Sequence, residues 1–175
     1  MQIHDKQFEV FISSKKIKER IREIAVEINK DYRDKKPLFL SILNGAFIFT
    51  TDLFREIVVP AEVSFIKLKS YRKTESTGKV KELVGLEHNI YDRNIIIVED
   101  IVDTGNTLNH ILQEFTDLGA KSIEILTLLH KPEATKKPVS LKYVGFEIPN
   151  EFVVGYGMDY EGYGRNLADL YKIKE

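Results

Sequence analysis

The stretch "VEDIVDTGNTL", residues 98–108, decides the fold class and points to the site. Four apolar residues, Ile95 to Val98, run directly into Glu99 and Asp100, and Asp103 follows three positions later. Charge is costly to hold beside a buried strand, so three carboxylates at this place need a reason. The stretch predicts a buried strand, then a turn of small and hydroxyl-bearing residues, and then a helix.

Strand-like and helix-like segments alternate on both sides of this stretch. In chain order we expect a helix capped by Ser13 or Ser14, a strand at 37–43, a turn and helix at 44–57, strands at 61–71 and 94–98, a helix at 104–119 that stops at Gly119, and strands at 121–129, 142–149 and 151–157. Residues 72–82 read as a loop between strand-like flanks, and 159–173 as an irregular tail.

This alternation predicts an α/β fold with a mainly parallel central sheet flanked by helices. We expect one domain over residues 1–175, with the N-terminal helix and the C-terminal pieces forming a small cap or hood. The helix at 104–119 is expected to bury one face, made of Leu108, Ile111, Leu112, Phe115 and Leu118.

Composition excludes several classes of protein. The net charge is −1, from 26 basic and 27 acidic residues, which leaves no footprint for nucleic acid. The chain has no cysteine, so disulfides, thiolate zinc sites and thiol nucleophiles are impossible. The first residues lack the layout of a signal peptide, and no apolar run approaches the ~20 residues of a membrane span. We expect a soluble cytoplasmic protein without membrane or nucleic-acid partners.

The end of the 94–98 strand is where a ligand is expected. In open α/β sheets ligands lie at the carboxyl ends of the strands, and a helix N-terminus attracts phosphate. Thr104 and Thr107 add hydroxyl donors, and Gly105 permits close approach of the backbone. The simpler interpretation is that Asp103 or Thr104 only caps the helix. The two adjacent carboxylates count against it, because capping needs one acceptor.

These residues resemble the signature for phosphoribosyl pyrophosphate (PRPP) of the type I phosphoribosyltransferases. "YVGFEIPNEFVVGYGMDY" with Arg165, "LNGAFIF" and "LKSYRKTESTGKV" are similar to the base-binding segment, the first active-site loop and the mobile second loop of their hypoxanthine-guanine branch. The resemblance covers residues 5 to 172. It implies transfer of a 5-phosphoribosyl group from PRPP to a purine base, with release of pyrophosphate, and Mg²⁺ as cofactor.

The resemblance also implies roles for the acidic stretch. Carboxylates near the sugar and magnesium on pyrophosphate stabilise a ribosyl-cation-like transition state. Glu99 and Asp100 would hold the ribose hydroxyls, directly or through magnesium, and Asp103 would exchange a proton with the purine N7. The 5′-phosphate would be bound by Asp103, Thr104, Gly105, Asn106 and Thr107. Relatives often carry Lys at the Asn106 position.

Pyrophosphate would be held by the loop that contains Asn44 and Gly45. Relatives commonly carry Lys at the Asn44 position, and the peptide before it can be cis, so the resemblance implies that Arg165 supplies the charge here. Ser70 and Tyr71 would lie on a lid that shields the reaction from water. Taken alone, Arg165 reads equally well as a solvated surface residue and the lid as an ordinary loop.

The base pocket is implied by the C-terminal segment. Phe152 would stack on the purine and the Val153 backbone would bind its edge, although Phe152 by pattern alone reads as core. Asp159 would approach the exocyclic edge or a second magnesium ion. The family places a Lys three residues before the aromatic of "YVGF" to bind the 6-oxo group. Ser140 stands there, and Lys142 is the other candidate donor.

Two other functions stay open. A non-catalytic regulator could keep the fold and bind PRPP or nucleotide, although the neutral charge and the acid at Asp103 disfavour it. A pyrimidine- or adenine-specific relative is disfavoured by "GFEIPNEFVVGYGMDY". The resemblance implies a homodimer or homotetramer.

Overall fold

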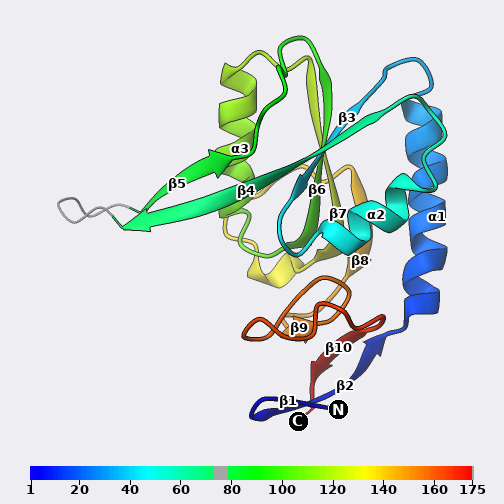
Figure 1. The fold of residues 1–175 in the computed structure, drawn as a ribbon, viewed down its shortest axis with the longest axis vertical. Helices are drawn as coiled ribbons and strands as arrows, with labels where there is room; N and C mark the ends of the chain where they lie inside the picture. Colours follow the sequence, from blue (N-terminus) through cyan, green and yellow to red (C-terminus); the bar gives the residue numbers. More distant parts are fainter. Residues whose placement is uncertain (73–78, 175) are drawn as a thin grey trace.

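A six-stranded sheet forms the centre of the molecule (Figure 1). The computed structural model describes residues 1–72 and 79–174, with the backbone alone at 68–72 and 79–84. In spatial order the strands are β5 (Lys79–Val84), β4 (Glu62–Arg72), β3 (Leu38–Ile42), β6 (Asn94–Val102), β7 (Ser122–His130) and β8 (Tyr143–Glu147). All neighbours pair in parallel except β4 and β5, which form an antiparallel hairpin. The mainly parallel sheet expected from the sequence is confirmed.

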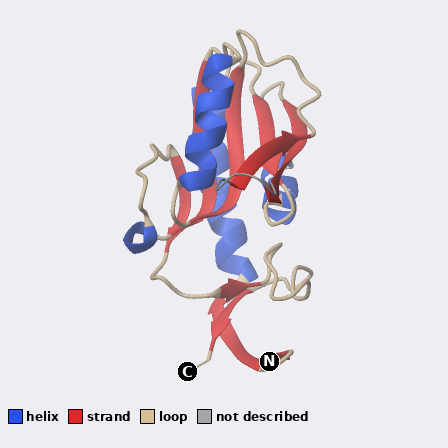
Figure 2. Cartoon of the chain, turned by 90° about the vertical axis from the view of Figure 1, so that its left-hand side faces the viewer, coloured by secondary structure: helices blue, strands red, loops and turns tan. Residues whose placement is uncertain are grey.

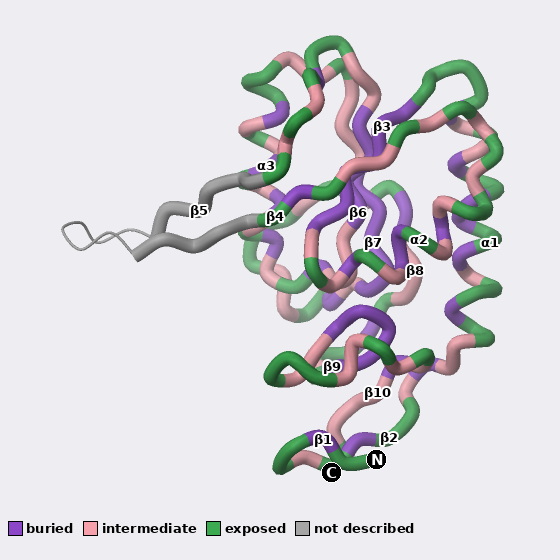
Figure 3. The backbone as a smooth tube through the Cα atoms, viewed as in Figure 1, coloured by how far each residue is buried: buried purple, intermediate pink, exposed green. Residues whose placement is uncertain are grey.

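Helices cover both faces of this sheet. α1 (Ser14–Asp31) and α2 (Phe47–Phe54) lie on one side and α3 (Asn106–Asp117) on the other (Figure 1). Because side chains alternate along a strand, β6 supplies both cores. Ile96 and Val98 join the cluster with α1 and α2, whereas Ile95 and Ile97 join the cluster with α3. Figure 3 shows β3 and β6 buried in the middle of the molecule.

The predicted helices are present, but the last of them ends earlier than expected. Ser13 caps α1 by accepting a hydrogen bond from the Lys16 N–H. The apolar residues that recur at helical spacing along α1 are all buried: Ile17, Ile21, Ile24, Ala25 and Ile28. Leu118 is 47% exposed, so its predicted burial is wrong. The reason is that α3 ends at Asp117 and Leu118 is already its C-cap.

A second, antiparallel sheet forms the hood at one end of the molecule (Figure 2). Its order is β1 (Gln2–Ile3), β2 (Lys6–Ile12), β10 (Leu170–Ile173) and β9 (Val153–Val154). The expected hood is confirmed, but its composition is corrected, because α1 packs on the central sheet and the tail contains β10. Strands this short carry little periodicity, and the partner of β2 lies about 160 residues along the chain.

The carboxyl ends of the parallel strands face the hood (Figures 1 and 2). β6 extends past the predicted end at Val98 to Val102, so Glu99 and Asp100 lie within the strand. Of the predicted loop 72–82, residue 72 belongs to β4 and residues 79–82 belong to β5, whereas residues 73–78 lie outside the described part. No helix in the described part of the chain is long and apolar enough to cross a membrane.

Candidate active site

The two adjacent carboxylates of β6 serve opposite sides of the sheet. Glu99 lines a pocket of about 80 Å³ together with residues of the 103–107 turn. Asp100 lies instead against the loop after β3, where a Cβ on Gly45 would fall 1.4 Å from Asp100 Oδ2. Burial raises the pKa of the Asp100 carboxyl, against the opposing effects of the Ile101 N–H and of Arg165. The acidic pair is therefore divided between two neighbouring compartments.

The turn before α3 presents the backbone N–H groups of the helix N-terminus. Gly105 has φ +76° and is the N-cap of α3, with no side-chain capping bond, so the predicted cap at Asp103 or Thr104 is wrong. Glycine is needed because a Cβ there would meet Lys137 O at 2.2 Å. The first N–H groups of a helix have no intrahelical acceptors and attract phosphate. Thr104 and Thr107 line the pocket, whereas the Asn106 amide donates to Thr104 Oγ1 at 3.2 Å.

Asp103 leaves its carboxylate available. The side chain is exposed, and within the described residues its carboxylate has no hydrogen-bond or ion-pair partner. Its backbone carbonyl accepts a hydrogen bond from Thr135 Oγ1 at 3.2 Å, which holds the turn against the segment after β7. A carboxylate that is not used to cap the helix or to pair with a cation can exchange a proton with a ligand.

Lys131 is the residue that sequence reasoning missed. It follows β7 directly, and its N–H donates to Val102 O at 2.9 Å, next to Asp103. Thr135 Oγ1 joins the two residues, because it contacts both Asp103 O and Lys131 O at 3.2 Å. Lys131 is only 8% exposed, and its ammonium has no partner among the described residues. Its place after an apolar strand was the available signal, the same one that marked Glu99.

The prediction that Lys142 binds the base is wrong. The Lys142 ammonium lies 3.5 Å from Asp31 and 3.6 Å from Glu124. The backbone N–H of Lys142 donates to Ile125 O. These residues belong to the end of α1 and the beginning of β7, at the end of the sheet opposite the turn. The prediction assumed that Lys142 lies within a strand, whereas β8 begins only at Tyr143.

Ser140 stays a prediction with weaker support. Its neighbours Val139 and Leu141 pack on the cluster beneath α3, in the segment that returns to the beginning of β8. Among the described contacts, none joins Ser140 to Asp103 or Phe152.

The loop after β3 and the C-terminal segment close against each other. The Leu43–Asn44 peptide is cis, as the resemblance allowed. A Cβ on Gly157 would meet Gly45 O at 2.1 Å, so glycine is required for this approach. Arg165 binds Gly157 O through Nη1 at 2.6 Å and Asp159 Oδ1 through Nη2 at 2.5 Å. Asn44, Gly45 and Arg165 therefore lie in one neighbourhood, and their role toward pyrophosphate stays a prediction.

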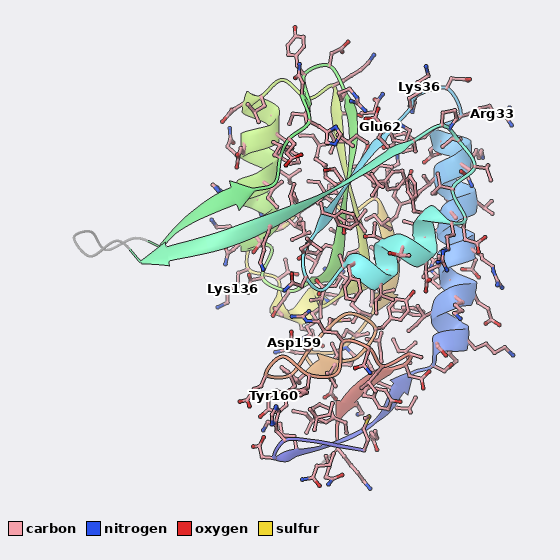
Figure 4. The ribbon with its side chains drawn as sticks, in the orientation of Figure 1. Arg33, Lys36, Glu62, Lys136, Asp159 and Tyr160 are labelled. Atoms are coloured by element: carbon pink, nitrogen blue, oxygen red, sulfur yellow. The ribbon has the colours of Figure 1, made fainter. Side chains whose placement is uncertain are left out.

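Asp159 and Phe152 lie in the hood, which faces this end of the sheet. Figure 4 shows Asp159 and Tyr160 in the hood, at the opposite end of the molecule from Glu62. Asp159 Oδ2 accepts from Gly162 N at 2.7 Å, so both of its oxygens are engaged. Phe152 is 43% exposed rather than core, and its ring meets Tyr160 edge to face at 5.7 Å. An exposed aromatic face can stack on a planar ligand.

The structure describes the predicted lid residues and the predicted metal ligands only in part. Ser70 and Tyr71 pair through their backbones with Lys81 and Val80 in the hairpin, while their side chains lie outside the described part. No group of three or more His, Asp or Glu side chains in that part could hold a metal. Glu99, Asp100 and Asp159, the predicted metal ligands, therefore do not form one ready-made cluster.

Comparison with known proteins identifies the family to which a chain with this fold and this candidate site belongs. The phosphoribosyl transferase domain family matches residues 12–161. The chain belongs to this family.

Within it, the chain is similar to the hypoxanthine-guanine phosphoribosyltransferase of Bacillus subtilis, 40% identical over 99% of this chain and 97% of that protein. It is 41% identical to the hypoxanthine phosphoribosyltransferase of Buchnera aphidicola, over 94% of each. A crystal structure of a hypoxanthine-guanine phosphoribosyltransferase from Bacillus anthracis matches with a TM-score of 0.88 and 35% identity, covering 97% of this chain and all of that one.

Proposed function

We propose that the protein is a purine-salvage phosphoribosyltransferase that converts hypoxanthine and guanine, with PRPP, to IMP and GMP. The observation that carries the proposal is the arrangement at the carboxyl ends of β6 and β7. There Thr135 Oγ1 contacts the backbone carbonyls of both Asp103 and Lys131, beside a pocket of about 80 Å³. The Asp103 side chain is exposed and the Lys131 side chain is buried. An oxopurine offers both a ring nitrogen and a carbonyl oxygen, which match these two groups.

The reaction breaks the bond between C1′ and the pyrophosphate oxygen and forms a bond from C1′ to a purine nitrogen. The turn 103–107 holds the 5′-phosphate and so fixes the ribose. Glu99 and Asp100 face the sugar from the two sides of β6 and stabilise positive charge on it. Asp103 exchanges a proton at N7 as the base changes from free purine to nucleotide.

Magnesium is the cofactor of the proposed reaction, and the residues fit it. Carboxylate oxygens are the ligands that Mg²⁺ prefers, and it is usually bound through one or two of them plus substrate oxygens and water. The absence of a three-ligand cluster in the described residues agrees with that mode. Because Glu99 and Asp100 lie in two neighbouring compartments, each would be a separate candidate ligand, and Asp159 is the candidate for a second ion. When bound, it neutralises charge on the departing pyrophosphate.

The base lies between the hood and the sheet in this proposal. Phe152 stacks on the purine, and the Val153 backbone binds its edge. Lys131 replaces Ser140 and Lys142 as donor to the 6-oxo group, because a buried ammonium gains most from an acceptor. The 6-amino group of adenine would offer that ammonium no acceptor, so oxopurines are the substrates.

The proposal treats residues 1–175 as one domain. The hood shares a core with the central sheet, since Ile12, Val153 and Leu170 belong to the cluster beneath α1. We include a cytoplasmic location and a homodimer or homotetramer, both of which rest on the resemblance.

The test is an assay of the purified chain with PRPP, Mg²⁺ and, separately, hypoxanthine, guanine, xanthine and adenine. We expect IMP and GMP, little or no AMP, and loss of product when magnesium is chelated. Formation of no nucleotide from any oxopurine would overturn the proposal.

A further inference from the structure

The loop proposed to bind pyrophosphate contains little positive charge. Asn44 and Arg165 line a cavity of about 480 Å³ with Leu43, Phe47 and Phe65, and Asn44 itself is neutral and exposed. The Arg165 guanidinium is already bound by Asp159. Pyrophosphate carries several negative charges, so one arginine that is shared with a carboxylate neutralises only part of them.

A second cation approaches the same loop from the neighbouring strand. Lys67 Nζ lies 3.5 Å from Asn44 Oδ1. This position is fixed by backbone, because Leu43 N donates to Ile66 O at 2.8 Å, and Ile66 pairs in register with Ile42. Lys67 therefore begins the part of β4 that extends beyond β3, directly beside the loop.

The ammonium of Lys67 is weakly held. In the described part of the chain its one polar partner is the Asn44 amide oxygen, at the long limit of a hydrogen bond, and the side chain is exposed. A lysine held this way keeps its rotamer freedom and its charge, and a phosphate oxygen is a stronger acceptor than a neutral amide. By contrast, Lys142 at the other end of the sheet is held by two carboxylates.

We propose that Lys67 is a pyrophosphate-binding residue and that Asn44 positions it. The adjacent strand supplies the cation that the loop lacks. The Asn44 amide oxygen holds the Lys67 ammonium beside the loop until pyrophosphate takes the place of the amide oxygen as its acceptor. This inference rests on the proposed function, because it assigns the residue to the pyrophosphate end of PRPP.

The first experiment compares Lys67→Gln with Lys121→Gln. Lys121 is an exposed lysine at the opposite end of the sheet. For each variant and the unchanged protein we would measure kcat, the KM values for PRPP and hypoxanthine, inhibition by inorganic pyrophosphate with Mg²⁺, and pyrophosphate binding by calorimetry. We expect Lys67→Gln to weaken PRPP and pyrophosphate binding by about 10- to 100-fold, the range for losing one charge-assisted contact. The KM for hypoxanthine and the thermal midpoint should stay unchanged.

The second experiment moves the charge back to the loop. Asn44→Lys in the Lys67→Gln background should restore most of the lost pyrophosphate affinity, and Asn44→Gln in that background should not. Equal pyrophosphate affinity in the Lys67→Gln and Lys121→Gln proteins would overturn the inference, and so would failure of Asn44→Lys to restore it.

The two proposals fail in different ways. If the unchanged protein makes IMP but Lys67→Gln binds PRPP normally, the function stands and the role of Lys67 is lost. If no oxopurine reacts, the function is lost, and calorimetry with inorganic pyrophosphate still tests Lys67.

Discussion

The two ends of the central sheet differ in whether certain charged side chains are paired with one another. At the amino-terminal end charges satisfy one another: Arg93 binds Glu62 at 2.8 Å, and Lys142 lies between Asp31 and Glu124. At the carboxyl end the Asp103 carboxylate and the Lys131 ammonium have no such partners among the described residues. The first arrangement stabilises the folded chain without a ligand. The second leaves charges to be satisfied by a ligand, which is the mark of a binding site.

The strongest test of this comparison is Asp103→Asn. Asparagine keeps the size of the side chain but cannot accept the purine proton, so turnover should fall by about 10²- to 10⁴-fold. PRPP affinity should change much less, because the phosphate turn is made by backbone. Steady-state kinetics with hypoxanthine and PRPP would measure both. Asp117→Asn on α3 is the matched control, and a variant at Asp103 with normal turnover would remove the proposed acid/base role.

The second test is Lys131→Met, which keeps most of the buried volume and removes the ammonium. Losing a charge-assisted hydrogen bond costs about 1.5–3 kcal/mol, so the KM for hypoxanthine should rise about 10- to 100-fold. The KM for PRPP should hardly change. Ser140→Ala is the control, since it tests the donor expected from the sequence. A larger effect at Ser140 than at Lys131 would reverse the assignment.

How much of the structure could be predicted from the sequence depends on whether a feature is local along the chain. Local patterns predicted β3, β6 and β7 because they are nearly continuous apolar runs. They predicted α1 and α3 because apolar residues recur at helical spacing and form one buried face. The signature at 98–108 predicted the turn before α3 that we propose binds phosphate, because its residues are contiguous along the chain. The failures are non-local. β10 pairs with β2 across almost the whole chain, and the partners of Lys142 come from two other elements.

The glycines of the site show the same limit. Gly45 and Gly157 are required because other segments approach their α-carbons closely, and only Gly105 could be interpreted from its own turn. Sequence reasoning thus identified the chemistry along the chain better than the contacts across it.

A third test asks whether Asp100, at the carboxyl ends of the parallel strands, lowers the unfolding free energy of the ligand-free protein. Asp100 is half-buried beside Gly45, where loss of water raises the pKa of its carboxyl, and such a carboxylate is unfavourable without a compensating cation. Asp100→Asn removes the charge and can still accept the Ile101 N–H through Oδ1. We expect the ligand-free variant to be more stable by about 1 kcal/mol, with its activity largely lost. Denaturant unfolding would measure it against exposed Asp34→Asn, and lower stability in the Asp100 variant would contradict the comparison.

The smallest effect is expected at the other end, from Tyr143→Phe. The buried Tyr143 hydroxyl donates to Asp31 Oδ2 at 2.7 Å and, with Lys142, holds the pKa of that carboxyl below its ordinary value of 3.8. Removing the hydroxyl should cost about 1 kcal/mol of unfolding free energy at pH 7 and leave turnover unchanged.

The pH dependence of this loss has a definite sign. A carboxyl whose pKa is lower in the folded state stabilises the protein above its ordinary pKa, and this contribution disappears as pH falls. The difference between the unchanged protein and Tyr143→Phe should therefore be full at neutral pH and shrink as pH falls through 3.8 and below. Unfolding curves at several pH values would follow it, with Tyr163→Phe as control because that side chain is 63% exposed. If the difference instead grew toward acid pH, or if turnover fell with it, the amino-terminal end would not be the purely stabilising half of the sheet.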